Sequence, residues 1–324
     1  MTLLEVRDLA VTYRSGGSDV RAVRGVDFTL DAGQTLGIAG ESGSGKSTVA
    51  LSLLRLLPVS AKITGELLFQ GEDVLTLGWG KLRAVRWAQM SVVFQGAMSA
   101  LNPVRSIGEQ IREPILLHEK VGGRTARART AELLDSVGVP SSRANAYPHE
   151  LSGGQRQRVM IAMALACRPN LIIADEPTTA LDVIVQAQIL ELLTDLVRES
   201  RIGLIMISHD LSVLGEVCER LAVMYAGRLA EIGPSRELLT DPRHPYTEAL
   251  AGAFPTIGDA ASRLAPSGLP GDPPDPAKVA DQGCAFQPRC PVALPDCATR
   301  DIEAWPAGPG RLAACVHVLD KVSS

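Results

Sequence analysis

Apolar and polar residues alternate near the start of the chain, with apolar side chains at Leu4, Val6, Leu9 and Val11. The chain then turns at SGGSD, and the alternation resumes in VRAVRGVDFTL. Alternation of this kind is typical of strands that bury one face. We therefore expect an antiparallel hairpin or meander at this end of the chain.

Three continuous apolar stretches further along predict buried strands, and each is followed by a helical pattern. QTLGIAG leads into KSTVALSLLRLL, which Pro58 closes; LIIADE leads into VIVQAQILELLTDLVRES; and GLIMISH leads into DLSVLGEVCERL. Repeated strand–helix units imply a mainly parallel sheet covered by helices. The expected fold class is therefore α/β.

Two regions depart from this pattern. Between Ala97 and Pro148 the strand signals disappear and helical pieces such as IGEQIREPILLHE and ARARTAELLDSVG take their place. This predicts an inserted helical subdomain over about residues 97–150. Eleven of the chain's 21 prolines lie between Pro255 and Pro309, and PGDPPDP is typical of an extended, stiff linker. We therefore expect one domain over residues 1–255 and a small proline-rich extension over residues 256–324.

Composition and local sequence limit the partners and the cellular location that we expect. The formal net charge of −4 argues against a nucleic-acid partner, because proteins that bind nucleic acids usually carry a basic surface. Glu5 and Asp8 interrupt the segment where a signal peptide would need basic and then apolar residues. The longest apolar run, VMIAMALAC, is shorter than the ~20 residues that span a bilayer. We expect a cytoplasmic protein, in which structural disulfides are disfavoured, and assign any membrane span to another chain.

GESGSGKS matches the phosphate-binding loop G-x-x-x-x-G-K-[ST], between a predicted strand and a predicted helix. The glycines let successive backbone N–H groups point at phosphate oxygens, and the helix adds the positive end of its dipole. Lys46 is expected to reach the terminal phosphates, and the Ser47 hydroxyl to bind Mg²⁺. The phosphate-binding candidates are Gly40, Ser42, Gly43, Ser44, Gly45, Lys46, Ser47 and Thr48.

LIIADE ends a predicted strand with two acids, Asp175 and Glu176. In a phosphoryl-transfer site Asp175 would hold the Mg²⁺ shell, and Glu176 would act as the general base on the attacking water. An acidic pair at a strand end can also be no more than a solvated turn. The phosphate loop upstream favours the first interpretation.

LSGGQ precedes a further helical pattern, QRQRVMIAMALAC. Ser152, Gly153 and Gly154 can present a hydroxyl and backbone amides to a γ-phosphate at the positive end of that helix. The alternative is an ordinary helix-entry turn capped by Ser152.

Together the three motifs make the chain resemble the ATP-binding cassette (ABC) ATPases over about Leu3 to Pro255, with GESGSGKS as Walker A, LIIADE as Walker B and LSGGQ as the signature. The resemblance implies ATP and Mg²⁺ as cofactors. It also implies a P-loop NTPase fold with an antiparallel β subdomain and an inserted helical subdomain.

Four further residues of this chain match positions that have functional roles in the family. Tyr13 looks like the aromatic that stacks on adenine, Gln95 like the glutamine that senses Mg²⁺ and the membrane partner, and His209 like the histidine that contacts the γ-phosphate. Asp182 looks like the loop residue that couples two ATP sites. Each also has a plain interpretation, as a surface aromatic, a polar loop residue or a neighbour of a helix cap. The implied catalytic residues are Lys46, Glu176 and His209, and the implied Mg²⁺ ligands are Ser47, Gln95 and Asp175.

In this family the signature of one cassette completes the ATP site of another. The resemblance therefore implies that this chain pairs with a second cassette, either a copy of itself or a related chain. The residues expected to act in trans are Ser152, Gly153, Gly154, Gln155 and Asp182.

A narrower resemblance, to the ATPase subunits of dipeptide and oligopeptide importers, is carried by MSALNP from Met98, DEPTTALDVIVQAQIL from Asp175 and HPYTEAL from His244. It implies ATP hydrolysis that powers peptide import from the cytoplasmic face of the membrane. The implied partners are a nonidentical second cassette, two permease subunits and an extracytoplasmic solute-binding protein. The alternatives are an importer ATPase for nickel or another solute, and a soluble ABC ATPase outside transport. Gly96 and Ala97 depart from the acidic residue and proline expected after Gln95, beside the expected permease contact.

Four of the six cysteines lie in the tail, without the short spacing usual in structural zinc sites: Cys284, Cys290, Cys297 and Cys315. Four thiolates can instead hold a [4Fe–4S] cluster, with zinc or unligated thiols as the alternatives. Some peptide-importer ATPases carry such a cluster in this tail, so the resemblance favours the cluster. Its expected role is to staple a segment with little core of its own. His317 is the reserve ligand, and Cys167 and Cys218 are expected in the core, within helices.

Overall fold

The computed structural model describes residues 1–15, 18–96, 100–179, 181–253, 269 and 271–318. The chain divides into two compact units. The first comprises Met1, Asp31–Gln34 and Thr76–Ile205, and the second comprises Thr2–Leu30, Thr35–Leu75 and Met206–Ser324. The boundary predicted after residue 255 lies outside the described residues and stays a prediction.

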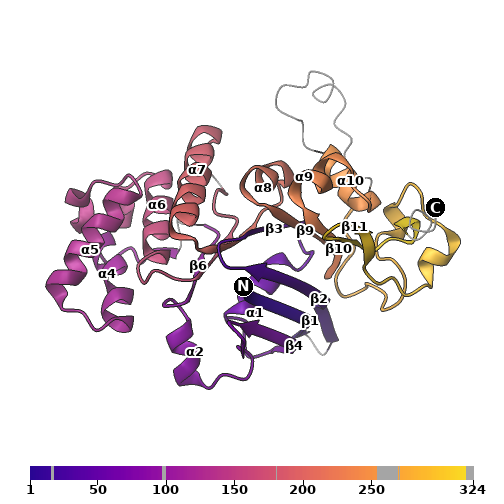
Figure 1. Cartoon of the computed structure of the whole chain (residues 1–324), viewed down its shortest axis with the longest axis horizontal. Helices are drawn as coiled ribbons and strands as arrows, with labels where there is room; N and C mark the ends of the chain where they lie inside the picture. Colours follow the sequence, from indigo (N-terminus) through magenta and orange to yellow (C-terminus); the bar gives the residue numbers. More distant parts are fainter. Residues whose placement is uncertain (16–17, 97–99, 180, 254–268, 270, 319–324) are drawn as a thin grey trace. The chain divides into compact units, whose positions relative to one another are not determined.

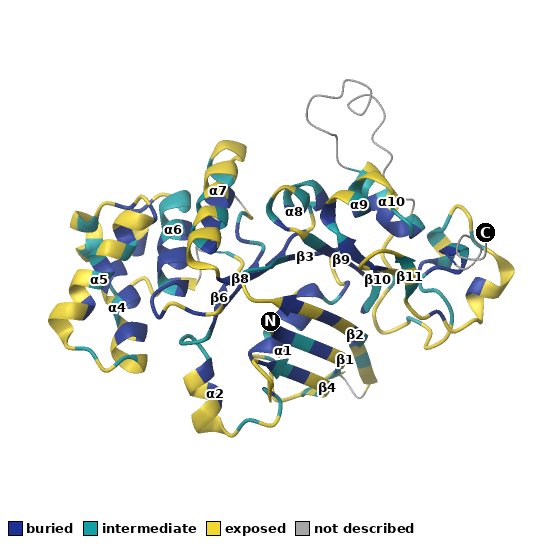
Figure 2. Ribbon diagram, viewed as in Figure 1, coloured by how far each residue is buried: buried dark blue, intermediate teal, exposed yellow. Residues whose placement is uncertain are grey.

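A four-stranded sheet in the second unit has the strand order β2–β1–β4–β5, and Figure 1 labels β2, β1 and β4 side by side. Its strands are β1 (Thr2–Ser15), β2 (Ser18–Asp31), β4 (Ala61–Phe69) and β5 (Glu72–Asp73). Buried and exposed positions alternate along β2 (Figure 2), as the sequence pattern predicts. The antiparallel register of β1 and β4 pairs Leu4 with Phe69 and Val6 with Leu67, which are all buried.

A second set of strands in this unit lies in the order β11–β12–β10–β9–β3. They are β3 (Thr35–Ala39), β9 (Arg220–Tyr225), β10 (Arg228–Pro234), β11 (Trp305–Gly308) and β12 (Arg311–Ala313). β3 and β9 run parallel, whereas the β9–β10, β10–β12 and β11–β12 pairs are antiparallel. The tail therefore adds two strands to β10, so it is not only the extended segment that its prolines predict.

The helices of the second unit are α1 (Lys46–Leu53), α8 (Leu211–Val217), α9 (Ser235–Thr240) and α10 (Pro245–Gly252). Figure 1 shows α8, α9 and α10 gathered beside β9 and β10. The tail also holds two short 3₁₀ helices, η3 (Gln287–Arg289) and η4 (Pro295–Ala298). α1 follows β3 directly through the phosphate-loop segment, which is the strand–loop–helix order that the sequence predicts.

The first unit is mostly helical. Its helices are α2 (Trp79–Val85), α4 (Ile107–His118), α5 (Gly123–Ser136), α6 (Gly153–Ala164) and α7 (Val183–Ser200), with 3₁₀ helices η1 (Ser141–Asn145) and η2 (Pro148–Glu150). β6 (Met90–Val93) and β7 (Leu171–Asp175) pair in parallel, and β8 (Gly203–Ile207) begins in this unit. α4 and α5 confirm the two predicted helical pieces and pack around Ile115 and Ala126. Within the described ranges, no helix has the length and apolar content needed to cross a bilayer.

Two predicted helices end earlier than expected. α6 ends at Ala164 and α8 at Val217, so Cys167 and Cys218 lie just beyond helices rather than within them. An apolar run fits a buried strand as well as a helix, and Leu221 belongs to β9. Both thiols are buried as predicted, and burial raises the pKa of Cys167 to about 11.

Candidate functional site

The phosphate loop joins β3 to α1 and is shaped by glycines with positive φ. A Cβ at Gly40 would lie 2.3 Å from the Met224 carbonyl oxygen, so no other residue fits there without displacement of backbone. Gly45 takes φ +103° immediately before α1. Lys46 is only 6% exposed, and its Nζ donates to the carbonyl oxygens of Gly40 (2.7 Å) and Glu41 (2.8 Å). The ammonium group is therefore held against the loop itself.

Two residues carried over by resemblance lie in the same unit as this loop. The Tyr13 hydroxyl lies 3.3 Å from the Thr48 hydroxyl, so this β1 side chain reaches the first turn of α1. His209 is exposed in the bend between β8 and α8, next to Asp210, which caps α8 by accepting from two backbone N–H groups. The structure thus brings Tyr13 to the phosphate-loop helix and leaves the His209 ring at a surface.

The first unit gathers polar side chains around Glu176, directly after β7. Gln95 Nε2 donates to Glu176 Oε2 (2.6 Å), and Thr179 Oγ1 donates to the same oxygen (2.8 Å). Glu176 has φ +45°, a conformation that non-glycine residues rarely adopt and that is often found at functional sites. Asp175, at the end of β7, is buried. The carboxylate predicted to be the base therefore accepts hydrogen bonds from two side chains, and its residue has a positive φ.

Thr179 also belongs to this cluster, although the sequence motifs alone do not assign it to the site. It lies three residues after Glu176 in DEPTT, and its backbone N–H donates to the Glu176 carbonyl oxygen (3.3 Å). That turn brings the hydroxyl back to the carboxylate. A short polar residue three positions after an acid at a strand end is the signal that points to such a turn.

LSGGQ forms the start of α6 through reciprocal hydrogen bonds. Gln155 N donates to Ser152 Oγ (3.2 Å), and Ser152 N donates to Gln155 Oε1 (3.1 Å), which is a capping box. A Cβ at Gly154 would lie 2.6 Å from Val185 Cγ1, so the second glycine lets α6 approach α7. The helix-entry interpretation is therefore correct locally. The predicted role of the signature in trans is compatible with it.

Asp182 has a local role of the same kind. Its side chain accepts from Val185 N (3.0 Å) and caps the N-terminus of α7. The coupling role carried over by resemblance stays a prediction.

The tail brings its four cysteines into one neighbourhood. Cys284 N donates to the Cys297 carbonyl oxygen (2.7 Å). Burial, with added repulsion from thiolate charge on the other three cysteines, raises the pKa of Cys315 to about 11. Among the described residues, no three His, Cys, Asp or Glu side chains are arranged so that they could hold a single metal ion.

The tail has more core than its composition predicts. Cys297 packs with Ile302 and Val316 in one small apolar cluster, and Cys315 packs in another. Nε2 of His317, the reserve ligand, is hydrogen-bonded to the Val292 carbonyl oxygen (2.8 Å).

Similar proteins identify the family. The ABC transporter family matches residues 23–179, and the oligopeptide/dipeptide transporter C-terminal region matches residues 230–297. The oligopeptide transport ATP-binding protein OppD of Salmonella typhimurium is 46% identical over 323 residues, which cover 99% of this chain and 95% of the relative. A putative peptide import ATP-binding protein of Brucella abortus is 49% identical over 298 residues, covering 91% of this chain and 89% of the relative.

A solved dimeric ATP-binding cassette, bound to ADP and phosphate in a post-hydrolysis state, superposes with a TM-score of 0.65. It is 30% identical, and the match covers 72% of this chain and 99% of that one. The predicted α/β cassette fold is thereby confirmed. The chain belongs to the ABC transporter family, among the ATP-binding proteins of oligopeptide and dipeptide transporters.

Proposed function

We propose that this chain is the ATP-hydrolysing subunit of a peptide importer. The observation that carries the hydrolytic part is the Glu176 carboxylate held by Gln95 and Thr179 directly after a buried strand. The relatives named for oligopeptide and peptide transport support the solute class. The match over residues 230–297 to the transporter C-terminal region supports it independently of the cassette motifs.

In this proposal each candidate site residue has a defined task in binding or hydrolysing ATP. Lys46 and the loop amides bind the β- and γ-phosphates, and Tyr13 stacks on adenine. Glu176 accepts a proton from the attacking water, whose oxygen bonds to the γ-phosphorus as the bond to the bridging oxygen breaks and ADP leaves. His209 contacts the γ-phosphate.

Mg²⁺ would be held by Ser47, Asp175 and Gln95, which offer the oxygen ligands that this ion prefers. When bound, it neutralises phosphate charge. Glu176 and Gln95 share a hydrogen bond, so a change at Gln95 reaches the base directly.

The proposed assembly pairs this chain with a second cassette whose signature completes its ATP site. Ser152, Gly153, Gly154, Gln155 and Asp182 act on the partner's nucleotide in the same way. Two permease subunits and an extracytoplasmic solute-binding protein complete the importer. The chain would sit peripherally at the cytoplasmic face of the membrane.

Uptake measurements test the solute class. Cells that lack this chain should lose accumulation of a labelled oligopeptide and should regain it when the chain is restored. Accumulation of nickel should stay at the parental level. Loss of nickel uptake with peptide uptake intact would replace the proposal with the nickel alternative, and loss of neither would favour an ATPase outside transport.

We also propose that Cys284, Cys290, Cys297 and Cys315 hold a [4Fe–4S] cluster. The Cys284 N–H donates to the Cys297 carbonyl oxygen (2.7 Å), which places two of the four cysteines close together. The cluster is proposed from the four cysteines of this tail and from the resemblance to peptide-importer ATPases, some of which carry one there. The cluster would staple the loops around η3 and η4.

Anaerobic purification tests the cluster. The protein should contain iron and acid-labile sulfide and should absorb near ~400 nm, as cysteine-ligated clusters do. Cys290→Ser should lower the iron content, whereas the matched control Cys167→Ser should leave it unchanged. Stoichiometric zinc without iron would overturn the cluster assignment.

A further inference from the structure

Arg289 in the tail forms an ion pair with Glu41, an acidic residue of the phosphate loop. Arg289 Nη1 lies 2.7 Å from Glu41 Oε2, and Arg289 Nη2 lies 3.0 Å from Glu41 Oε1. The side chains of the two residues are only 7% and 21% exposed. A bidentate, largely buried pair of this kind fixes both position and orientation. The hydrogen bonds to Glu41 raise the pKa of Arg289, so the guanidinium stays charged.

A second contact to Glu41 comes from the motif His244–Pro245–Tyr246 and is made to the backbone of Glu41. Glu41 N donates to the Tyr246 hydroxyl (2.9 Å), and Tyr246 is fully buried. His244 accepts from Tyr246 N (3.0 Å), and Pro245 occupies the first turn, so the first two residues of the motif begin α10 in the correct place. The three residues together deliver one hydroxyl to the phosphate loop.

Arg289 is itself held in place. Its Nη1 donates to the Tyr225 hydroxyl (3.3 Å), and its guanidinium lies 5.9 Å from the centre of the Tyr225 ring. Phe286 packs edge-on against Tyr225 and also contacts the Tyr246 ring. Gln287 N donates to the Cys284 carbonyl oxygen (3.0 Å), so η3 is anchored in the cysteine segment. Arg289, which contacts Glu41, therefore lies on a 3₁₀ helix that is attached to the segment containing the tail cysteines.

Glu41 lies where a displacement would reach the phosphate-binding groups. Its carbonyl oxygen accepts from Lys46 Nζ (2.8 Å) and from Ser44 N (3.2 Å). Movement of Glu41 would therefore shift both the lysine and the amides of the loop. Glycines supply little rigidity of their own, so an external anchor has a clear function here.

We propose that Tyr246 and Arg289 are positioning residues for ATP binding, which hold the phosphate loop in its binding-competent shape through Glu41. A loop that spends only part of its time in that shape binds ATP more weakly in proportion to that fraction. The competing interpretation is that the pair only attaches the tail to the cassette.

Nucleotide titrations of the purified full chain separate the two interpretations. Arg289→Gln should raise the Kd for Mg²⁺–ATP by about tenfold, which corresponds to about 1.4 kcal/mol. Tyr246→Phe keeps the ring and should raise Kd by a smaller factor. Arg289→Lys keeps a charge without the bidentate fork and should lie between the parent and Arg289→Gln. In the assembled transporter, KM for ATP should rise while kcat at saturating ATP stays within about threefold of the parental value.

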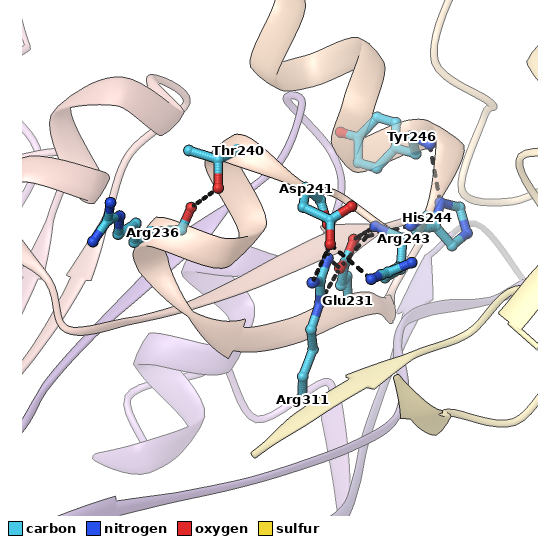
Figure 3. Close-up of polar contacts among 8 residues, drawn as sticks. All are labelled: Glu231, Arg236, Thr240, Asp241, Arg243, His244, Tyr246 and Arg311. Atoms are coloured by element: carbon cyan, nitrogen blue, oxygen red, sulfur yellow. Dashed lines mark hydrogen bonds and ion pairs between the residues drawn. The ribbon is translucent and has the colours of Figure 1, made fainter. Parts of the chain in front are cut away.

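Two tail arginines serve as controls. Arg300 pairs with exposed Asp296 on the tail surface, and Arg300→Gln should leave Kd unchanged. Arg311 anchors β12 through buried Glu231 (Figure 3); Arg311→Gln should lower stability and should change Kd less than Arg289→Gln does.

The charge-reversed pair Glu41→Arg with Arg289→Glu should recover part of the affinity that each single reversal loses. Parental ATP affinity in both Arg289→Gln and Tyr246→Phe would overturn the proposal. So would an Arg311→Gln chain that loses as much affinity as Arg289→Gln, since attachment of the tail would then explain both.

Discussion

Replacing Arg311 with methionine should destabilise the second unit strongly, because it leaves a buried carboxylate without its partner. Glu231 and Arg311 have side chains 0% and 2% exposed, and Arg311 Nε donates to Glu231 Oε1 (2.8 Å). Arg311 Nη2 also donates to the Asp241 carbonyl oxygen (Figure 3). Methionine keeps the apolar stem and removes every donor. β12 and the tail would then lose their charged anchor on β10.

The magnitude follows from what remains around Glu231. Breaking a buried ion pair from one side costs about 3–5 kcal/mol. The backbone N–H groups of Arg243 (3.0 Å) and His244 (3.0 Å) continue to donate to the carboxylate, so we expect the lower end, about 3 kcal/mol. The free energy of unfolding from urea titration of the full chain measures this cost. Hydrogen exchange at the β12 amides should accelerate in parallel.

A matched set of variants makes the result decisive. Arg300→Met removes an exposed tail arginine and should cost less than about 1 kcal/mol. Glu231→Gln combined with Arg311→Met removes the stranded charge and should be more stable than Arg311→Met alone. If Arg311→Met costs no more than Arg300→Met, or if the double variant is the least stable, the buried pair does not anchor the tail.

Two further predictions concern other buried contacts. Burial lowers the pKa of His244 to about 4, so the folded chain takes up its proton at lower pH than the unfolded chain, and stability should fall as pH drops from about 6.5 toward 4, by up to about 3 kcal/mol. His244→Asn keeps a capping oxygen and should flatten this part of the stability–pH curve; an unchanged slope would assign it to another group. Thr179→Ala removes one donor to Glu176 and should lower kcat for ATP about tenfold with KM unchanged. Unchanged turnover in that variant would show that the hydroxyl does not position the base.

Local motifs predicted the strand–loop–helix order around GESGSGKS, because their geometry depends on consecutive residues. The glycines of GESGSGKS permit the positive φ angles observed at Gly40 and Gly45. The capping boxes at the starts of α4 and α6 are equally local. The helix ends near Cys167 and Cys218 were harder to predict, because apolar runs there continue past the last helical turn.

The tail shows what sequence patterns could not supply. Arg289 and Glu41 are 248 positions apart, and nothing local to either predicts the pair. β12 has three residues, too few for an alternation signal, yet it pairs with β10 through Ile232 and Leu312. Long-range pairing of short strands depends on tertiary context rather than propensity. Proline content predicted an extended linker but could not indicate where the tail attaches.

The hydrolytic assignment is tested most directly by Glu176→Gln in the purified transporter. Glutamine keeps the shape of the side chain and one acceptor for Gln95 and Thr179, but it cannot take a proton from water. ATP turnover should fall by about 10²-fold or more, while the Kd for Mg²⁺–ATP should stay within about threefold of the parental value. Turnover at the parental rate, with ATP bound normally, would contradict the assignment of Glu176 as the base.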